Sequence, residues 1–268
     1  MKKKTEEVHG ALDLLEEGVH LIRRASLRLL LQYYIGSFPF VIGFLYFWAD
    51  MSRGAFAHRH ISEAALGVSV LYIWMKCWQS VYCLNLYSRL STQQEQTFSL
   101  KRILRIIATQ MILQPYGLFL IPFSILIVLP FAWTFGFFQN VLVIGDGNDL
   151  NLRRIIRTSW RLASLWAAQN HRMLLIVTVF TFVVFINVGV LLLFIPQLLK
   201  MLFGIETIFT LSGFHVLNTT FLSVVVAITY LCFDPLIVTV YTLRCFYGES
   251  IGSGADLVAE LNGLAKAS

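Results

Sequence analysis

The sequence lacks charge over long stretches, and the longest of them decides the class of protein. Residues 106–145 contain no Asp, Glu, Lys, Arg or His. A single helix of this length would extend about 60 Å, whereas a bilayer core is about 30 Å thick. The stretch therefore predicts a hairpin of two membrane-spanning helices. We expect its turn between Pro115 and Pro122, where Pro and Gly interrupt the apolar pattern.

Charged residues are also scarce in the chain as a whole. They make up 13% of the 268 residues, while 57% are hydrophobic; soluble domains carry about 25% charged residues. This length suits one membrane domain and leaves no room for a separate soluble enzyme domain. The net charge of +6 comes from basic residues that flank apolar segments, so we expect a lipid bilayer rather than nucleic acid as the partner.

The motifs of common catalytic and metal sites are missing as well. The four cysteines form no CxxC pair, and neither a glycine-rich phosphate loop nor HExxH occurs. A GxSxG pattern at 248–252 follows an apolar segment instead of a strand, which is the wrong context for a nucleophile elbow. His58 and His60 flank Arg59 without nearby Cys or paired carboxylates, so a solvated loop is favoured over a metal site. We predict a non-enzymatic protein with no catalytic residues, metal or cofactor.

What the sequence does contain is a series of apolar segments of membrane-spanning length. They predict an all-α integral membrane protein with six transmembrane helices, at about 29–48, 64–87, two within 106–145, 173–198 and 215–243. The domain organisation that follows is a cytoplasmic amphipathic N-terminal helix (1–28), a six-helix membrane domain (29–247) and a cytoplasmic C-terminal tail (248–268). In the N-terminal helix the apolar face is expected at helical spacing, on Val8, Leu12, Leu15, Val19 and Ile22.

A short basic pattern recurs in the chain. Residues 99–105 (SLKRILR) match residues 151–157 (NLRRIIR), and each copy begins with a residue that favours helix N-caps. A weaker third copy occupies residues 21–28. The repeat predicts three helical hairpins, each preceded by an amphipathic interfacial helix.

The distribution of basic residues predicts the orientation. With six spans, 17 of the 21 Lys and Arg residues lie on the side of the N-terminus and three lie on the opposite side. The positive-inside rule then places both termini in the cytoplasm.

The basic helix starts and the end of the last span resemble a known family. Asp234-Pro235 is followed by Leu243-Arg244 and then by Asp256-Leu257, although residues 248–254 depart from the pattern. In these two features the chain resembles the membrane domain attached to some bacterial glycerophosphodiester phosphodiesterases and its stand-alone relatives. The resemblance implies a six-helix protein of the bacterial inner membrane. It implies no phosphodiesterase activity, because the catalytic domain is missing.

Two charged residues are expected at membrane depth, Lys76 and Asp234. Such residues usually face the bundle interior and often pair. A structural link between them is one interpretation, and a solute or proton path is another; Asp234 could also be an internal N-cap ahead of Pro235. Gln79 and Ser80 extend the polar face around Lys76 at helical spacing.

Residues 151–170 predict a helix with two distinct sides. Arg153, Arg154, Arg157 and Arg161 share one sector of the helical wheel, and Leu152, Ile155, Ile156, Trp160, Leu162, Ala163 and Trp166 share the other. Such a helix suits the headgroup plane of a membrane. The arginines then either recognise anionic lipid or simply anchor and orient the chain.

We therefore expect a scaffold or accessory subunit of a membrane complex, with a membrane protein or a second copy of the chain as its partner. A small transporter of solute or lipid that uses Lys76 and Asp234 is the alternative. A long polar cavity at Lys76 would favour the transporter, and a solidly packed bundle there would favour the scaffold.

Overall fold

The computed structural model describes residues 10–91, 99–127, 131–148, 151–206, 218–254 and 257–258. Of these residues 91% are helical and none lies in a strand. The elements are α1 (Ala11–Arg24), α2 (Leu27–Arg53), the 3₁₀ turn η1 (Ala57–Arg59), α3 (Ile61–Leu90), α4 (Leu100–Ile127), α5 (Phe131–Ile144), α6 (Leu152–Ser164), α7 (Ala167–Phe203) and α9 (Thr219–Ser253). The all-helical class predicted from the sequence is confirmed.

Four of the described helices are long and apolar enough to cross a membrane, namely α2, α4, α7 and α9. The chain is thus an integral membrane protein by the length and composition of its helices. Helix α3 has 30 residues, but its polar side chains keep it outside this set. Helix α5 has only 14 residues, which is about 21 Å of helix and less than a bilayer core.

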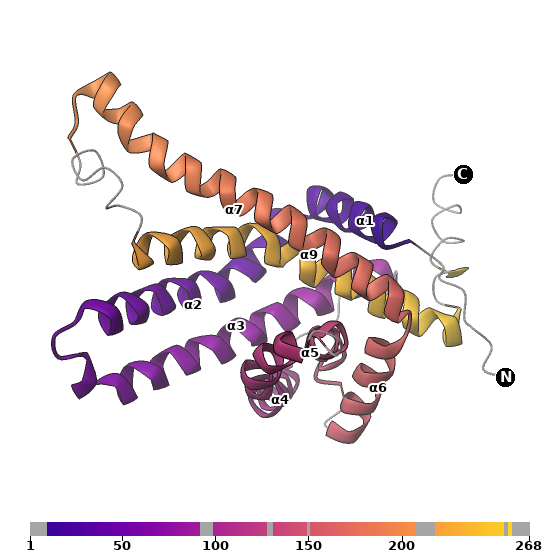
Figure 1. The fold of residues 1–268 in the computed structure, drawn as a ribbon. Coiled ribbons are helices and arrows are strands. Elements are labelled where there is room, and N and C mark those ends of the chain that lie inside the picture. The colour runs from indigo at the N-terminus through magenta and orange to yellow at the C-terminus, as the bar shows by residue number, and fades with distance from the viewer. Residues whose placement is uncertain are drawn as a thin grey trace.

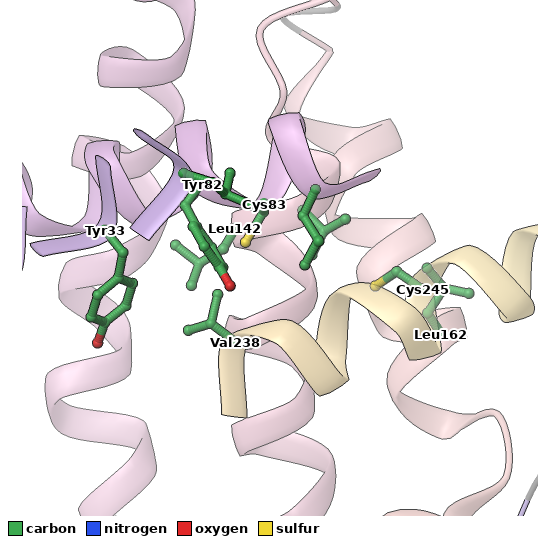
Figure 2. Packing of buried hydrophobic residues seen from close by; sticks show 10 residues of the cluster. Tyr33, Tyr82, Cys83, Leu142, Leu162, Val238 and Cys245 are labelled. Atoms are coloured by element: carbon green, nitrogen blue, oxygen red, sulfur yellow. The ribbon is translucent and has the colours of Figure 1, made fainter. Parts of the chain in front are cut away.

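Helix α9 occupies the centre of the described fold. Figure 1 shows it between the α2–α3 pair on one side and α7 on the other, with α1 against its C-terminal half. Helices α2 and α3 run side by side, whereas α4 is seen nearly end-on and crosses them. Side chains from α2, α3, α5, α6 and α9 meet in one buried apolar cluster (Figure 2), which includes Tyr33, Tyr82, Leu142, Leu162 and Val238.

The prediction of a turn between Pro115 and Pro122 is wrong. Both prolines lie inside α4, which continues to Ile127. A proline removes one backbone hydrogen bond, but in an apolar environment nothing else competes for the remaining backbone groups, so the helix is retained. The short helix α5 then begins at Phe131.

Two other prolines show how neighbouring helices compensate for the missing bond. Pro39 and Pro235 have no N–H, so the carbonyls of Ile35 and Leu231, four residues earlier, lose their helical donors. The Trp74 indole Nε1 donates to the Ile35 carbonyl at 3.2 Å, and the Tyr34 hydroxyl donates to the Leu231 carbonyl at 3.3 Å. Aromatic donors from the adjacent helix therefore join α3 to α2 and α2 to α9.

The N-caps predicted from the repeat are confirmed in two copies. The Ser99 hydroxyl accepts from the Arg102 N–H at 3.3 Å, and the Asn151 side chain accepts from the Arg154 N–H at 3.3 Å. The separate interfacial helix expected before the second hairpin does not form, because residues 100–105 continue directly into α4. The third copy at 21–28 also differs, since it spans the end of α1 and the start of α2.

The buried face of α1 is not the one expected from the sequence. Leu15 is buried, but Leu12 is 60% exposed and Val19 is 42% exposed, while Val8 lies outside the described residues. The face that packs on α7 and α9 instead contains Ala11, Leu14, Leu15 and Gly18. Two apolar stripes overlap on this helix, and the absence of a side chain at Gly18 lets the second one approach Val240 of α9 closely.

Candidate functional site

A buried polar site joins α2, α3 and α9 around Asp234. One carboxylate oxygen of Asp234, Oδ2, accepts hydrogen bonds from the Tyr33 hydroxyl and from Gln79 Nε2, the latter at 2.7 Å. The side chains of Tyr33 and Gln79 are fully buried, and Asp234 is only 7% exposed. Two donors on one oxygen favour the carboxylate and partly offset the cost of burying its charge.

Lys76 is linked to this carboxylate through the side-chain amide of Gln79. Its Nζ donates to Gln79 Oε1 at 2.9 Å, while the other end of the same amide donates to Asp234. The amide is thus oriented with its oxygen toward the ammonium group and its NH₂ toward the carboxylate, as two opposite charges require. The Lys76 ammonium also lies 5.6 Å from the centre of the Tyr72 ring, within range of a cation–π contact.

Tyr230 completes the group of residues that we call the Asp234 cluster: Tyr33, Lys76, Gln79, Tyr230 and Asp234. Tyr230 lies one helical turn before Asp234 on α9, which places both side chains on one face. Its hydroxyl accepts from Gln79 Nε2 at 3.2 Å and contacts Met75 Sδ at 3.3 Å. The cluster therefore ties three helices together with side chains that bond mainly to one another.

The sequence predictions for this site have mixed outcomes. The expected link from Lys76 toward Asp234 is present, but it runs through Gln79 rather than by direct contact. The expectation that Ser80 extends the polar face around Lys76 is wrong, since its hydroxyl donates to the Leu142 carbonyl of α5 at 2.8 Å. The internal N-cap at Asp234 is also wrong, because α9 is continuous and the carboxylate bonds to other helices.

Sequence reasoning missed Tyr33 and Tyr230. Tyr33 is 201 positions from Asp234 along the chain, and a Tyr-Tyr pair in an apolar span is most simply interpreted as core. A usable signal was present, because a buried Tyr hydroxyl normally needs a polar partner. The rotation of α2 about its own axis decides which of Tyr33 and Tyr34 faces the carboxylate, and no sequence pattern specifies that rotation.

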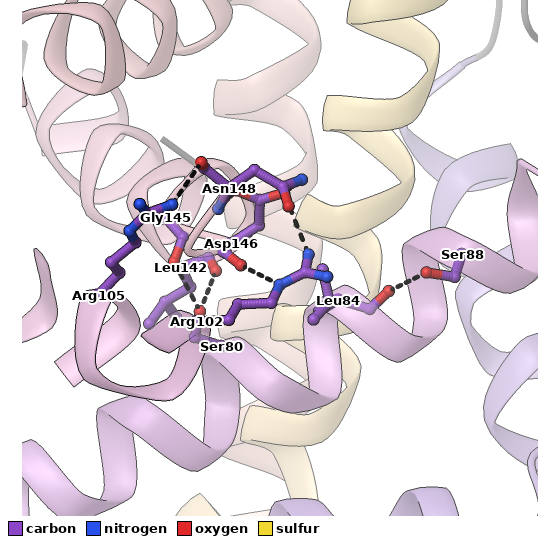
Figure 3. A network of polar contacts seen from close by, with 9 residues as sticks. All are labelled: Ser80, Leu84, Ser88, Arg102, Arg105, Leu142, Gly145, Asp146 and Asn148. Atoms are coloured by element: carbon purple, nitrogen blue, oxygen red, sulfur yellow. Dashed lines mark hydrogen bonds and ion pairs between the residues drawn. The ribbon is translucent and has the colours of Figure 1, made fainter. Parts of the chain in front are cut away.

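A second polar network fixes the start of α4 to the end of α5 (Figure 3). Arg102, only 8% exposed, donates from Nε to the Asp146 backbone carbonyl at 2.8 Å and contacts the Asp146 carboxylate at 3.4 Å. Arg105 donates to the Asn148 carbonyl at 3.0 Å. Burial raises the pKa of the Asp146 carboxyl group, while bonding to Asn148 and the charge of Arg102 act in the opposite direction. These arginines were predicted only as topology signals, and their structural role was missed.

A third network surrounds the corner between α6 and α7. Arg244 of α9 is 3% exposed and donates to the Leu165 carbonyl and, at 3.3 Å, to Gln169 Oε1. The Tyr241 hydroxyl donates to Asn170 Oδ1 at 2.7 Å. Arg244 was expected only as a basic residue beside a membrane span. In the structure it also joins α9 to the α6–α7 corner.

The four arginines predicted to face lipid are all exposed on α6. On the predicted apolar sector Ile155, Leu162, Ala163 and Trp166 are buried, whereas Ile156 is 41% and Trp160 is 56% exposed. Helix α6 thus packs one side on the protein, with Ile156 and Trp160 left on the flank beside the arginines. An exposed Trp next to arginine is the composition typical of a membrane interface.

The two weaker motifs lie in ordinary structural settings. Ser250 of the GxSxG pattern is buried inside α9 and donates to the Phe246 carbonyl of its own helix at 2.8 Å, so no nucleophile elbow forms. His60 Nε2 lies 2.7 Å from the Asp50 carboxylate in the connection between α2 and α3.

No family model matches the chain, and no curated protein or solved structure is significantly similar to it. The resemblance to the phosphodiesterase-linked membrane domain therefore stays a prediction, and function has to be argued from the geometry above.

Proposed function

We propose that this protein is a non-enzymatic membrane protein that acts as a scaffold or accessory subunit of a membrane complex. The observation that supports the proposal is the closed geometry of the Asp234 cluster. Tyr33 and Gln79 are fully buried, and the polar atoms of the cluster bond to each other across α2, α3 and α9. A site that bonds to itself in this way holds helices together.

The partner of such a scaffold would be another membrane protein or a second copy of this chain. Helix α7 offers surface for it, since only 6% of its most apolar stretch is buried. Lipid covers that surface wherever a partner does not.

The alternative function, transport of a small solute or lipid, rests on one observation. Lys76 as a whole residue is only part-buried, as is Tyr230, whereas Tyr33, Gln79 and Asp234 are buried. A groove of about 670 Å³ between α3 and α4 is lined by neither Lys76 nor Asp234. The hydrogen bonds that join Lys76, Gln79 and Asp234 to one another therefore favour the scaffold.

The test compares wild type with the double replacement Lys76→Met with Asp234→Asn in cells that lack the native gene. If the cluster is structural, the double variant should complement the deletion and recover the same membrane proteins after extraction in mild detergent. A double variant that is as stable as wild type but fails to complement would favour transport through these charges.

We further propose six spans, α2, α3, α4, α5, α7 and α9, with both termini in the cytoplasm of a bacterial cell. Helix α5, with only 14 residues, would cross where the bilayer is locally thinned around it. The basic asymmetry of 17 to three supports this orientation. A cysteine introduced at the exposed Ala55 should react with a membrane-impermeant thiol reagent in intact cells. A cysteine at the exposed Ser164 should react only after permeabilisation, with wild type giving the background. The reverse labelling pattern would contradict the orientation.

The arginine face of α6 is proposed to bind anionic headgroups. Each basic residue near an anionic surface contributes about 1 kcal/mol, so replacing Arg154, Arg157 and Arg161 with Glu should weaken retention of phosphatidylglycerol by at least roughly tenfold. Replacing the same residues with Lys keeps the charge and is the matched control. Equal lipid retention by the Glu and Lys variants, measured by mass spectrometry of the purified protein, would argue against an interfacial role.

A further inference from the structure

A groove of about 670 Å³ lies beside α3, away from the Asp234 cluster. Its walls are apolar side chains from Leu66 to Val81 of α3 and from Ile103 to Met111 of α4, with Gln32 of α2 at one end. Several of these side chains are open to the surroundings of the helices; Val70 is 61% exposed and Met111 is 58% exposed. The groove thus opens toward lipid rather than toward the interior of the bundle.

The wall on the α2 side is held in place before anything binds. The Trp74 indole donates to the Ile35 carbonyl, which Pro39 leaves without a helical donor. Trp78 packs edge-on against Trp74 at 5.8 Å between ring centres and lies directly over Gly36. A preformed wall lowers the entropy cost of binding a flexible chain.

One end of the groove is polar and basic. Gln32, which lines it, accepts from Asn85 Nδ2 of α3 at 2.8 Å. Arg28 is exposed one helical turn before Gln32, on the same face of α2. Arg89 lies one turn beyond Asn85 on α3, where it donates to the Ser26 hydroxyl at 3.1 Å. Arg28 and Arg89 therefore lie one helical turn beyond the polar end of the groove, and neither is among the side chains that line it.

We propose that this groove binds one acyl chain of an anionic phospholipid, with the headgroup phosphate held by Arg28 and Arg89. Guanidinium groups match the geometry of phosphate oxygens, and the apolar walls match a hydrocarbon chain. The volume lies in the range of pockets that bury a small ligand, roughly 300–1,000 Å³. This site is separate from the arginine face of α6, and it depends on neither the scaffold nor the transporter proposal.

The experiment is native mass spectrometry of the purified protein after exchange into phosphatidylglycerol or phosphatidylcholine. Wild type, and the α6 variant with Arg154, Arg157 and Arg161 replaced by Glu, should both retain a phosphatidylglycerol molecule at the groove more strongly than phosphatidylcholine. The variant Arg28→Gln with Arg89→Gln should lose about tenfold or more of that preference, because two phosphate contacts are removed. The matched control, Arg53→Gln with Arg59→Gln, changes two arginines at the opposite end of the α2–α3 hairpin and should retain the lipid like wild type.

A second variant tests the apolar part of the site. Ile107→Trp places a larger side chain in the groove, and it should reduce retention of both lipids, whereas Val190→Trp on the exposed surface of α7 should not. Thermal unfolding of each variant confirms that it is folded. Equal retention of the two lipids by wild type, or unchanged retention in both the arginine and the Ile107 variants, would overturn the proposal.

Discussion

Replacing Asp234 with Asn is expected to destabilise the protein by about 3–5 kcal/mol, the range observed when one partner of a buried charged network is removed. The substitution leaves the Lys76 ammonium without a counter-charge. The amide oxygen of the introduced Asn can still accept from Tyr33 and Gln79, whose Nε2 donates to the carboxylate at 2.7 Å in the wild type, but it carries no charge. The measurement is the free energy of unfolding in mixed detergent micelles.

The companion change Lys76→Met should cost less than Asp234→Asn. Lys76 is part-buried and its carboxylate partner keeps two other donors, from Tyr33 and Gln79. Glu63→Gln is the control, since Glu63 is an exposed acid at the start of α3, and it should change stability by less than about 0.5 kcal/mol. An Asp234→Asn variant as stable as this control would show that the cluster does not hold the helices together.

The second large effect is expected at Gly36, where α2 and α3 approach each other closely. A Cβ atom on Gly36 would lie 2.5 Å from Trp78 Cβ, 3.2 Å from the Met75 carbonyl oxygen and 3.3 Å from Met75 Cα. Two of these contacts are backbone atoms, which cannot rotate away, so the helices would have to separate. We expect Gly36→Ala to cost about 1–3 kcal/mol, as other cases of overpacking do.

Gly67 of α3 provides the matched control for Gly36. A Cβ atom there meets nothing within 4 Å, and Ala is a better helix former than Gly. Gly67→Ala should therefore be neutral or slightly stabilising in the same unfolding measurement. A Gly36→Ala variant as stable as Gly67→Ala would mean that α2 and α3 are farther apart than described.

The sequence was sufficient for the class of fold and for features set by local chemistry. Absence of charge over 106–145 indicated membrane helices, and the N-caps at Ser99 and Asn151 followed from residue type and spacing. Lys76 and Asp234 stood out because charge is rare at membrane depth.

Features that depend on how helices rotate and pack could not be predicted in the same way. Pro115 and Pro122 are strong turn signals in water, but α4 continues through both. Ser80 shares a helix face with Gln79 only loosely, and it bonds to α5 while Gln79 bonds to α9. Tyr33 became part of the site through a contact between segments 201 residues apart, which no periodicity records.

The central claim is that the Asp234 cluster is a structural connection among α2, α3 and α9. Its most direct test is the free energy of unfolding of the double variant, Lys76→Met with Asp234→Asn, measured beside both single variants. Removing both charges leaves no uncompensated ion, and buried ion pairs are often replaced by neutral groups at little cost. We therefore predict that the double variant is more stable than Asp234→Asn alone and recovers most of the loss. A double variant whose loss equals the sum of the two single losses would show that the charges do not interact, and would contradict the claim.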